Sequence, residues 1–201
     1  MVNAGSIEAN LEAARNGDAS AFNWLQNRLQ PQVARFAGRL LKDTAMADDA
    51  TQGAFLSLYV NMGSIRSPGS VKTYLYRITR NLCYDELRRR GRFEHVTYDE
   101  TMEVPPFPTN NSGTDLPDEV VASLRLYEKV GEAIDKLPEQ QRQTMILYFH
   151  EDLRYREIAD VLSIDIGTVK SRIHLARKRL RIILGPEFLD EMGLTPDTRH
   201  L

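Results

Sequence analysis

The sequence predicts an all-α fold in which a flexible acidic linker joins two small helical domains, the second of them a helix-turn-helix. Apolar residues recur at spacings of three and four in both halves of the chain, which is typical of amphipathic helices, and no convincing alternating pattern indicates a strand. A proline-rich acidic stretch lies between the halves. Near the end, a short apolar helix pattern, a turn and a longer basic helix pattern follow one another.

Length and composition limit the number of domains and the class of protein only broadly. The chain has 201 residues, enough for one large or two small domains, and its 42% hydrophobic and 27% charged residues are ordinary for a soluble globular protein. No apolar run approaches the roughly 20 residues of a membrane span, and we expect no signal peptide. One cysteine, Cys83, excludes an internal disulfide framework. We therefore expect a cytoplasmic protein without membrane insertion.

The first domain, expected over residues 1–93, contains three apolar stripes. Pro31 interrupts the first stripe and should break or kink its helix. Asp48 and Asp49 precede the second, where acids suit the positive end of a helix dipole. A loop rich in glycine and serine, 63–70, precedes the third. The stripes consist, in order, of Phe22, Leu25, Leu29, Val33, Phe36 and Leu40; of Ala54, Phe55, Leu58 and Met62; and of Val71, Leu75, Ile78 and Leu82.

Residues 94–122 form the expected linker. Seven acids and no lysine or arginine lie between Glu94 and Glu119, and four prolines lie between residues 101 and 119. Prolines remove backbone donors and restrict the residues before them, so neither a helix nor a central strand should form. A long surface loop within one domain is the alternative interpretation.

The apolar pattern of the second domain, expected over residues 123–184, predicts four helices. Pro138 should begin the second of them, where its missing N–H costs nothing, and that helix should continue to about His150. The turn SID follows the third helix, and Gly167 or Thr168 should open the fourth. The inward residues are, in order, Val130, Ile134 and Leu137; Met145, Ile146 and Phe149; Ile158, Ala159 and Leu162; and Val169, Ile173, Ala176 and Leu180.

Positive charge concentrates in the last helix, although the formal net charge of the chain is −2. Six bases and no acid lie between Ile166 and Arg181. An α-helix fits the major groove of DNA, with base-reading side chains toward its N-terminal end and phosphate contacts elsewhere. By position, Lys170, Ser171 and His174 suit base edges, whereas Arg172, Arg177, Lys178 and Arg179 suit phosphates. A solvated basic face on a protein that binds no DNA is the alternative.

This region resembles a known family. Residues 137–181 read LPEQQRQTMILYFHEDLRYREIADVLSIDIGTVKSRIHLARKRLR, which is similar to the fourth domain of sigma-70 family initiation factors in their extracytoplasmic-function (ECF) version. Ser163 stands where the family usually has glycine, so the turn is expected to differ slightly. The resemblance implies binding of the −35 promoter element. The residues expected at this interface are Thr168, Lys170, Ser171, Arg172, His174, Arg177 and Lys178.

The first half resembles the same family. Residues 46–59, MADDATQGAFLSLY, are similar to its core-polymerase-binding helix, which docks on the coiled coil of the β′ subunit. An ordinary core helix with an acidic first turn is the alternative interpretation. The polymerase-binding residues that the resemblance implies are Asp48, Asp49, Gln52, Phe55 and Leu56.

Residues 70–92, SVKTYLYRITRNLCYDELRRRGR, resemble the helix of this family that reads and opens the −10 element. Cations that track the backbone and aromatic rings that stack on unpaired bases suit opened DNA. Tyr74 and Val71 stand where ECF members often have Trp and Phe, and Tyr74 or Tyr76 packing in the core is the alternative. The implied −10 residues are Ser70, Thr73, Tyr74, Arg77, Arg80, Asn81, Tyr84 and Arg88.

Together the resemblances imply a bacterial transcription initiation factor that binds core RNA polymerase, through the β′ coiled coil and the β subunit, and promoter DNA at the −35 and −10 elements. They also imply an anti-sigma factor as a partner and a linker in the polymerase's nucleic-acid path. The tail, 185–201, lies past the resemblance; Phe188, Leu189 and Met192 could form an amphipathic turn that docks on a domain or a regulator.

Two other classes of function compete with this one. An enzyme is disfavoured, because the histidines are scattered without metal-ligand spacing and neither a Gly-rich phosphate loop nor a nucleophile elbow is present. We expect no catalytic residue, metal or cofactor. The second alternative is an autonomous helix-turn-helix regulator, which would bind its operator tightly without polymerase.

Overall fold

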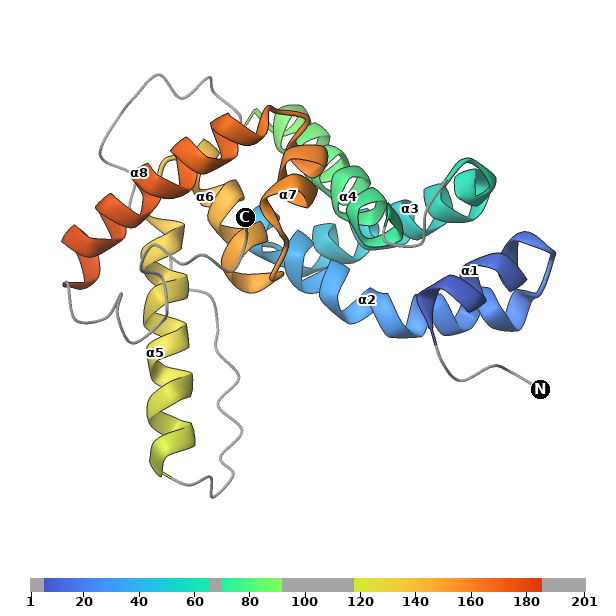
Figure 1. The fold of residues 1–201 in the computed structure, drawn as a ribbon, viewed down its shortest axis with the longest axis horizontal. Coiled ribbons are helices and arrows are strands. Elements are labelled where there is room, and N and C mark those ends of the chain that lie inside the picture. Colours follow the sequence, from blue (N-terminus) through green and yellow to red (C-terminus); the bar gives the residue numbers. More distant parts are fainter. Residues whose placement is uncertain (1–5, 66–69, 92–117, 186–201) are drawn as a thin grey trace. The chain divides into compact units, whose positions relative to one another are not determined.

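The computed structural model describes residues 6–65, 70–91 and 118–185 (Figure 1). Within these ranges the regular structure is helical and contains no strand, which confirms the predicted all-α class. The chain divides into two compact units, whose main boundary falls between residues 91 and 118. Most of the predicted linker, the end of the loop at 63–70 and the tail from residue 186 lie outside the described residues.

The described part of the first unit is a packed set of helices. Side-chain caps accept hydrogen bonds from the first turns of α1, α2 and α3, and these caps are Ser6, Asp18 and Asp43. Helix α1, which buries Leu11 and Ala14, is not among the helices that the sequence predicts. The elements are α1 (Ile7–Arg15), α2 (Ala19–Leu41), α3 (Thr44–Asn61), the short 3-10 turn η1 (Met62–Ser64) and α4 (Ser70–Arg89).

Pro31 lies inside α2, which runs without interruption from Ala19 to Leu41, so the break suggested by the sequence does not occur. Proline in a helix interior costs about 3 kcal/mol, because it removes one backbone hydrogen bond and crowds the preceding turn. Leu29 and Val33, on either side of Pro31, are both buried. Burying such side chains contributes roughly 1.5–3 kcal/mol each, which offsets the cost of the proline.

Helix α3 begins earlier than the sequence suggested. Its cap is Asp43, whose carboxylate accepts a hydrogen bond from the backbone N–H of Met46 at 3.0 Å. Asp48 and Asp49 therefore lie in the second turn, and the predicted dipole interaction in the first turn is wrong for them. Both carboxylates are exposed.

The core of the first unit combines residues of the three predicted stripes with Leu11 and Ala14 of α1. Side chains from α2, α3 and α4 interleave, and Phe22, Ile78 and Leu82 pack against them in partly buried positions. The buried members include Leu25, Leu29, Val33, Ala54, Phe55, Leu58, Val71 and Leu75. These buried residues determine which face of α4 points to the core, and therefore which face points outward.

In the described part of the second unit, α5 is longer than predicted and begins inside the segment assigned to the linker. The helix that follows it ends in a π-helical turn, reaching His150 as predicted, with Pro138 as its cap residue. The elements are α5 (Asp118–Asp135), α6 (Glu139–Met145), η2 (Ile146–His150), α7 (Tyr155–Leu162) and α8 (Ile166–Leu184).

Helix α8 begins at Ile166, one or two residues before the predicted start, because Asp165 caps it. The Asp165 carboxylate accepts a hydrogen bond from the N–H of Gly167 at 2.6 Å. The four inward residues of α8 are all buried, as predicted: Val169, Ile173, Ala176 and Leu180.

Candidate nucleic-acid and partner interfaces

The turn between α7 and α8 fixes the direction of the basic helix. Ser163 has a φ of 55°, in the left-handed region that favours glycine. The N–H of Ile164 donates to the carbonyl of Ala159 at 3.1 Å, which closes the end of α7. Ile158 and Val161 of α7 are fully buried. The helix, turn and helix that the sequence predicted are therefore present, with the strained serine at the turn.

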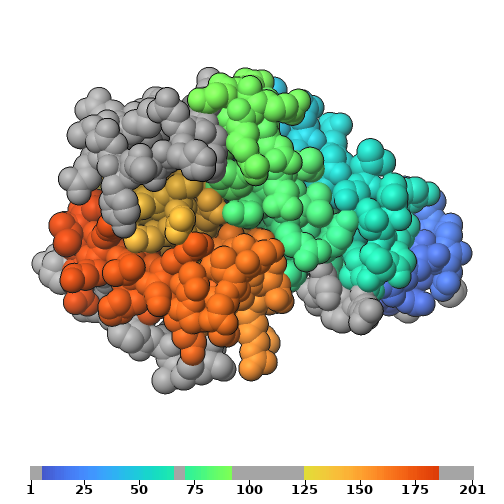
Figure 2. Space-filling view, turned by 90° about the horizontal axis from the view of Figure 1, so that it is seen from above, coloured from blue at the N-terminus to red at the C-terminus, as the bar shows by residue number. Residues whose placement is uncertain are grey.

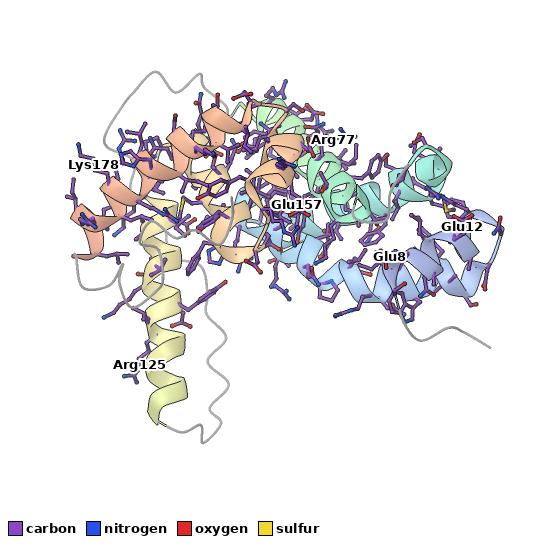
Figure 3. All side chains as sticks on the ribbon, in the orientation of Figure 1. Glu8, Glu12, Arg77, Arg125, Glu157 and Lys178 are labelled. Atoms are coloured by element: carbon purple, nitrogen blue, oxygen red, sulfur yellow. The ribbon has the colours of Figure 1, made fainter. Side chains whose placement is uncertain are left out.

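The outward side of α8 carries polar and basic side chains. Lys178 is one of the exposed cations (Figure 3), and in the space-filling view α7 and α8 form a continuous stretch of surface (Figure 2). Lys170 and Ser171 lie in the N-terminal half of the helix, where a helix in a major groove contacts bases. The predicted residues that the structure leaves exposed are Thr168, Lys170, Ser171, His174 and Lys178.

Three arginines of α8 differ from the prediction, because their guanidinium groups bond to the protein itself. Each donates to an oxygen of α6 or η2, and the Arg177 guanidinium also lies 5.4 Å from the centre of the Tyr148 ring. These contacts hold α8 against α6. They are Arg172 to Gln140 Oε1 at 3.0 Å, Arg177 to Tyr148 Oη at 3.0 Å, and Arg179 to Gln141 Oε1 at 3.1 Å.

Helix α4 presents a second basic surface. Arg77, Asn81 and Arg88 are exposed, and Thr73 and Arg80 are partly exposed (Figure 3 labels Arg77). Ser70 begins the helix, but its side chain lies outside the described part. In the last turn, surface ion pairs join Arg88 to Asp85 at 3.4 Å, and Arg89 and Arg90 to Glu86. Both side chains of the Arg88–Asp85 pair are exposed, and such a pair is worth about 0–1 kcal/mol, so a phosphate could replace the Asp85 carboxylate at little cost.

The tyrosines of α4 are less available than predicted. Tyr84, one of the implied −10 residues, is 3% exposed, with the Arg80 guanidinium 4.9 Å from its ring centre, so its ring is not presented on the surface. Tyr76 packs edge-to-face on Phe36, as the core alternative proposed. The Tyr74 hydroxyl lies 2.9 Å from Ser57 Oγ, which ties α4 to α3.

Helix α3 exposes one face that combines acids, an amide and apolar groups. Asp48, Asp49, Gln52 and Leu56 lie on this face, with Leu56 66% exposed. Phe55 is only 3% exposed, so the structure places it in the core and removes it from the predicted contact surface.

Two further residues of this face, Tyr59 and Val60, are 55% and 71% exposed and are not among the predicted contact residues. Their spacing of three and four from Leu56 continues the face by one turn, which a helical wheel could have indicated. The α3 surface is defined from here on as Asp48, Asp49, Gln52, Leu56, Tyr59 and Val60.

Within the described ranges, no cluster of three histidine, cysteine or acidic side chains has the geometry of a metal site. Among the same residues, no helix is both long and apolar enough to cross a membrane.

Comparison with known proteins gives matches in both units. Residues 25–93 match the model of Sigma-70 region 2, and residues 127–180 match that of Sigma-70, region 4. The ECF RNA polymerase sigma factor SigW of Bacillus subtilis is 30% identical over 177 residues, covering 87% of this chain and 95% of the relative. The ECF RNA polymerase sigma-E factor of Escherichia coli K12 is 31% identical over 172 residues, covering 85% and 90%.

A solved structure is also similar. The sigma factor RpoE of Bartonella quintana, in a co-crystal with the anti-sigma factor NepR, matches with a TM-score of 0.60 and 25% sequence identity. The match covers 83% of this chain and 98% of that chain.

Proposed function

Since this chain belongs to the extracytoplasmic-function group of RNA polymerase sigma factors, we propose that it binds core RNA polymerase and directs it to specific promoters. In this proposal it recognises the −35 and −10 elements and helps to open the DNA. The observation that carries the proposal is the match of two successive sigma-70 regions to two separate helical units, in the order that the family has them. As a sigma factor it would act without catalysing a reaction itself, in the cytoplasm with the polymerase.

We propose that α8 reads the −35 element. Its exposed N-terminal half supplies Lys170, Ser171 and His174 for base edges, and Thr168 and Lys178 for the DNA backbone. The inward bonds of Arg172 and Arg177 support a different task for these two, which is to hold α8 in position.

For the −10 element, we propose a surface on α4 made by Thr73, Arg77, Asn81 and Arg88, with Arg80 beside it. These side chains supply cations for phosphates and an amide for base edges. A base that stacks on Tyr84 would require Arg80 to move from its ring. Tyr74 is partly exposed, its hydroxyl is held at Ser57, and the Arg77 guanidinium lies 5.8 Å from its ring centre, so a base that stacks on this ring would require Arg77 to move.

We propose that core polymerase binds the α3 surface. Carboxylates and an amide beside exposed apolar groups suit a basic amphipathic helix, such as the β′ coiled coil that the family uses. The β subunit is the second expected polymerase contact. An anti-sigma factor is a further proposed partner, which is supported by the similar sigma factor that was solved with one.

Reconstitution with core RNA polymerase tests the proposed function. Mixed with core enzyme and a library of promoter fragments, the chain should give initiation at defined start sites, and neither component alone should do so. An autonomous regulator would instead bind its operator tightly by itself and leave core enzyme without defined start sites.

The polymerase contact has its own test. Replacing Asp49 and Gln52 by alanine should reduce capture of core enzyme on an affinity column. The matched control replaces Glu8 and Gln30, an exposed acid and an exposed amide on α1 and α2, and should keep normal capture. If the Asp49 and Gln52 variant captured core enzyme as well as the control did, the α3 surface would not be the contact.

A further inference from the structure

Helix α8 exposes apolar side chains on the same side as one of its proposed DNA contacts. Leu175 is 48% exposed and Ile182 is 79% exposed. They are seven residues apart, so both lie on one face of the helix. Lys178 lies between them, three residues from one and four from the other, and is also exposed. We call Leu175, Lys178 and Ile182 the α8 strip.

The strip has the character of a docking surface. Single exposed apolar side chains are ordinary, but Leu175 and Ile182 share one helix face and are not part of the core of the second unit. A cation between the apolar groups favours an occupant that is apolar and acidic.

The chain itself supplies such a segment immediately after α8. Residues 186–201 read PEFLDEMGLTPDTRHL, with the acids Glu187, Asp190, Glu191 and Asp197 against the single base Arg199. The apolar residues Phe188, Leu189 and Met192 are interspersed among those acids. The composition of this tail is therefore complementary to the α8 strip.

The end of α8 allows the tail to return along the helix. Gly185 follows the last turn with a φ of 89°, a conformation open to glycine that turns the chain away from the helix path. Leu175 lies about 15 Å back along the helix from Gly185, at 1.5 Å per residue. The sixteen residues after Gly185 can span roughly 50 Å when extended, so the strip is well within reach.

We propose that residues 186–201 fold back on α8, cover Leu175 and Ile182 with their apolar side chains and place their acids beside Lys178 and Arg181. The consequence for DNA binding rests on the proposed function of α8. The tail would compete with DNA for the outward side of the helix, so the chain alone would bind promoter DNA more weakly than its second unit allows. A second copy of the chain or a polymerase subunit are the other possible occupants.

Methyl NMR of the full chain tests the docking directly. The spectrum is compared with that of a chain ended after Gly185, and the signals of Leu175 and Ile182 should move. Leu175 is ten residues from the cut, too far to respond unless the tail lies on it. The methyl groups of Ile173, on the buried side of α8, serve as the internal control. Unmoved Leu175 signals, or signals that change on dilution as a second copy would require, would overturn the proposal.

DNA binding tests the competition, using fluorescence anisotropy with a labelled duplex of arbitrary sequence at low salt. Leu189→Ser and Ile182→Ser leave every charge in place, so a change in affinity reports docking rather than altered electrostatics. If the tail occupies the strip about four-fifths of the time, each variant should bind about fivefold more tightly, and the double variant no more than either one. Ala19→Ser, a change to serine at an exposed position of α2 outside every proposed contact surface, should have no effect.

The outcomes distinguish a failure of the proposed tail docking from a failure of the proposed function of α8. Equal affinities for the chain and both variants, or strictly additive gains, would overturn the competition by the tail. A loss of core enzyme binding in Ile182→Ser with unchanged methyl signals would assign the strip to a polymerase subunit and also overturn it. No DNA binding by any variant, with the Leu175 signals still shifted by the tail, would instead contradict the proposed function of α8.

Discussion

Arg177 and Lys178 are neighbours in α8, yet the structure gives them opposite tasks. The Arg177 guanidinium donates to Tyr148 Oη at 3.0 Å and lies 5.4 Å from the centre of that ring. Lys178 is exposed (Figure 3). Arg177→Ala should therefore destabilise the second unit and leave DNA contacts intact, whereas Lys178→Ala should do the reverse.

The expected cost of Arg177→Ala follows from three terms. A hydrogen bond from a charged group contributes about 1.5–3 kcal/mol, and a partly buried cation–π contact adds roughly 1 kcal/mol. Arg177 Nε is buried and has no hydrogen-bond partner within the described residues, and such a group costs about 1–3 kcal/mol. The terms leave a net loss of ~1 kcal/mol. Lys178→Ala should change stability by less than ~0.5 kcal/mol.

Two measurements on the full chain separate these effects. Hydrogen exchange at the amides of Ile173 and Leu180 reports opening of the second unit, and Trp24, the only tryptophan, reports the first unit by fluorescence. The salt dependence of DNA affinity counts phosphate contacts, each of which adds about 0.9 to the slope. Lys178→Ala should lower that slope by about 0.9, and Arg177→Ala should not change it.

The opposite result would refute the tasks assigned to Arg177 and Lys178. If Arg177→Ala lowered the salt slope by one contact while exchange at Ile173 stayed unchanged, the side chain would leave Tyr148 for phosphate, and its inward geometry would not describe the bound state. Arg177→Lys is a useful intermediate, because lysine keeps the charge but lacks the planar group that bonds and stacks at once.

Three further predictions concern single residues. Ser163→Gly should stabilise the second unit by about 0.5–1 kcal/mol in the same exchange assay. A left-handed backbone costs a residue with a Cβ about 1–2 kcal/mol, and the entropy that glycine loses on folding cancels part of the gain from removing this strain. The control Ser171→Gly, within α8, should instead destabilise the unit by about 0.5 kcal/mol. Burial raises the pKa of the Cys83 thiol to about 12, so iodoacetamide should modify the unfolded chain and spare the native one, as mass spectrometry can show. The free energy of unfolding should also fall as the pH rises above 9.0, because the unfolded state loses this proton first. Lys170→Ala should cost about 1–3 kcal/mol at promoters with its preferred −35 base and little at others, as competitive binding to a promoter library measures; equal weakening everywhere would contradict base reading.

The sequence predicts the all-α class and the inward faces of the helices because burial decides which face of each helix points inward. Val169, Ile173, Ala176 and Leu180 were assigned by spacing alone, and all are buried. Helix ends were less predictable, because caps determine them. Asp43 and Asp165 accept hydrogen bonds from backbone N–H groups and begin α3 and α8 earlier than the apolar pattern indicates.

The predicted sites stay predictions, and the structure shows only which of their side chains are exposed. A helical wheel separates inward from outward positions, but it does not show whether a long side chain turns back to the protein. Arg172 and Arg177 lie at the edge of the inward face of α8, where acceptors on α6 and η2 reach them. Phe55 illustrates the converse, because a residue that resembles a family contact by position is needed by the core of its own unit.

These inward contacts change how the charge of the chain should be counted. Six bases lie between residues 166 and 181, but Arg172, Arg177 and Arg179 have hydrogen-bond partners within the protein. The exposed cations are Lys170, Lys178 and Arg181. Once the tail has left α8, these cations release counterions from DNA without losing a bond, so the helix should then contribute a salt slope of about 2.7 rather than about 5.4. Three of the six bases therefore hold α8 in position, and the other three supply its affinity for DNA.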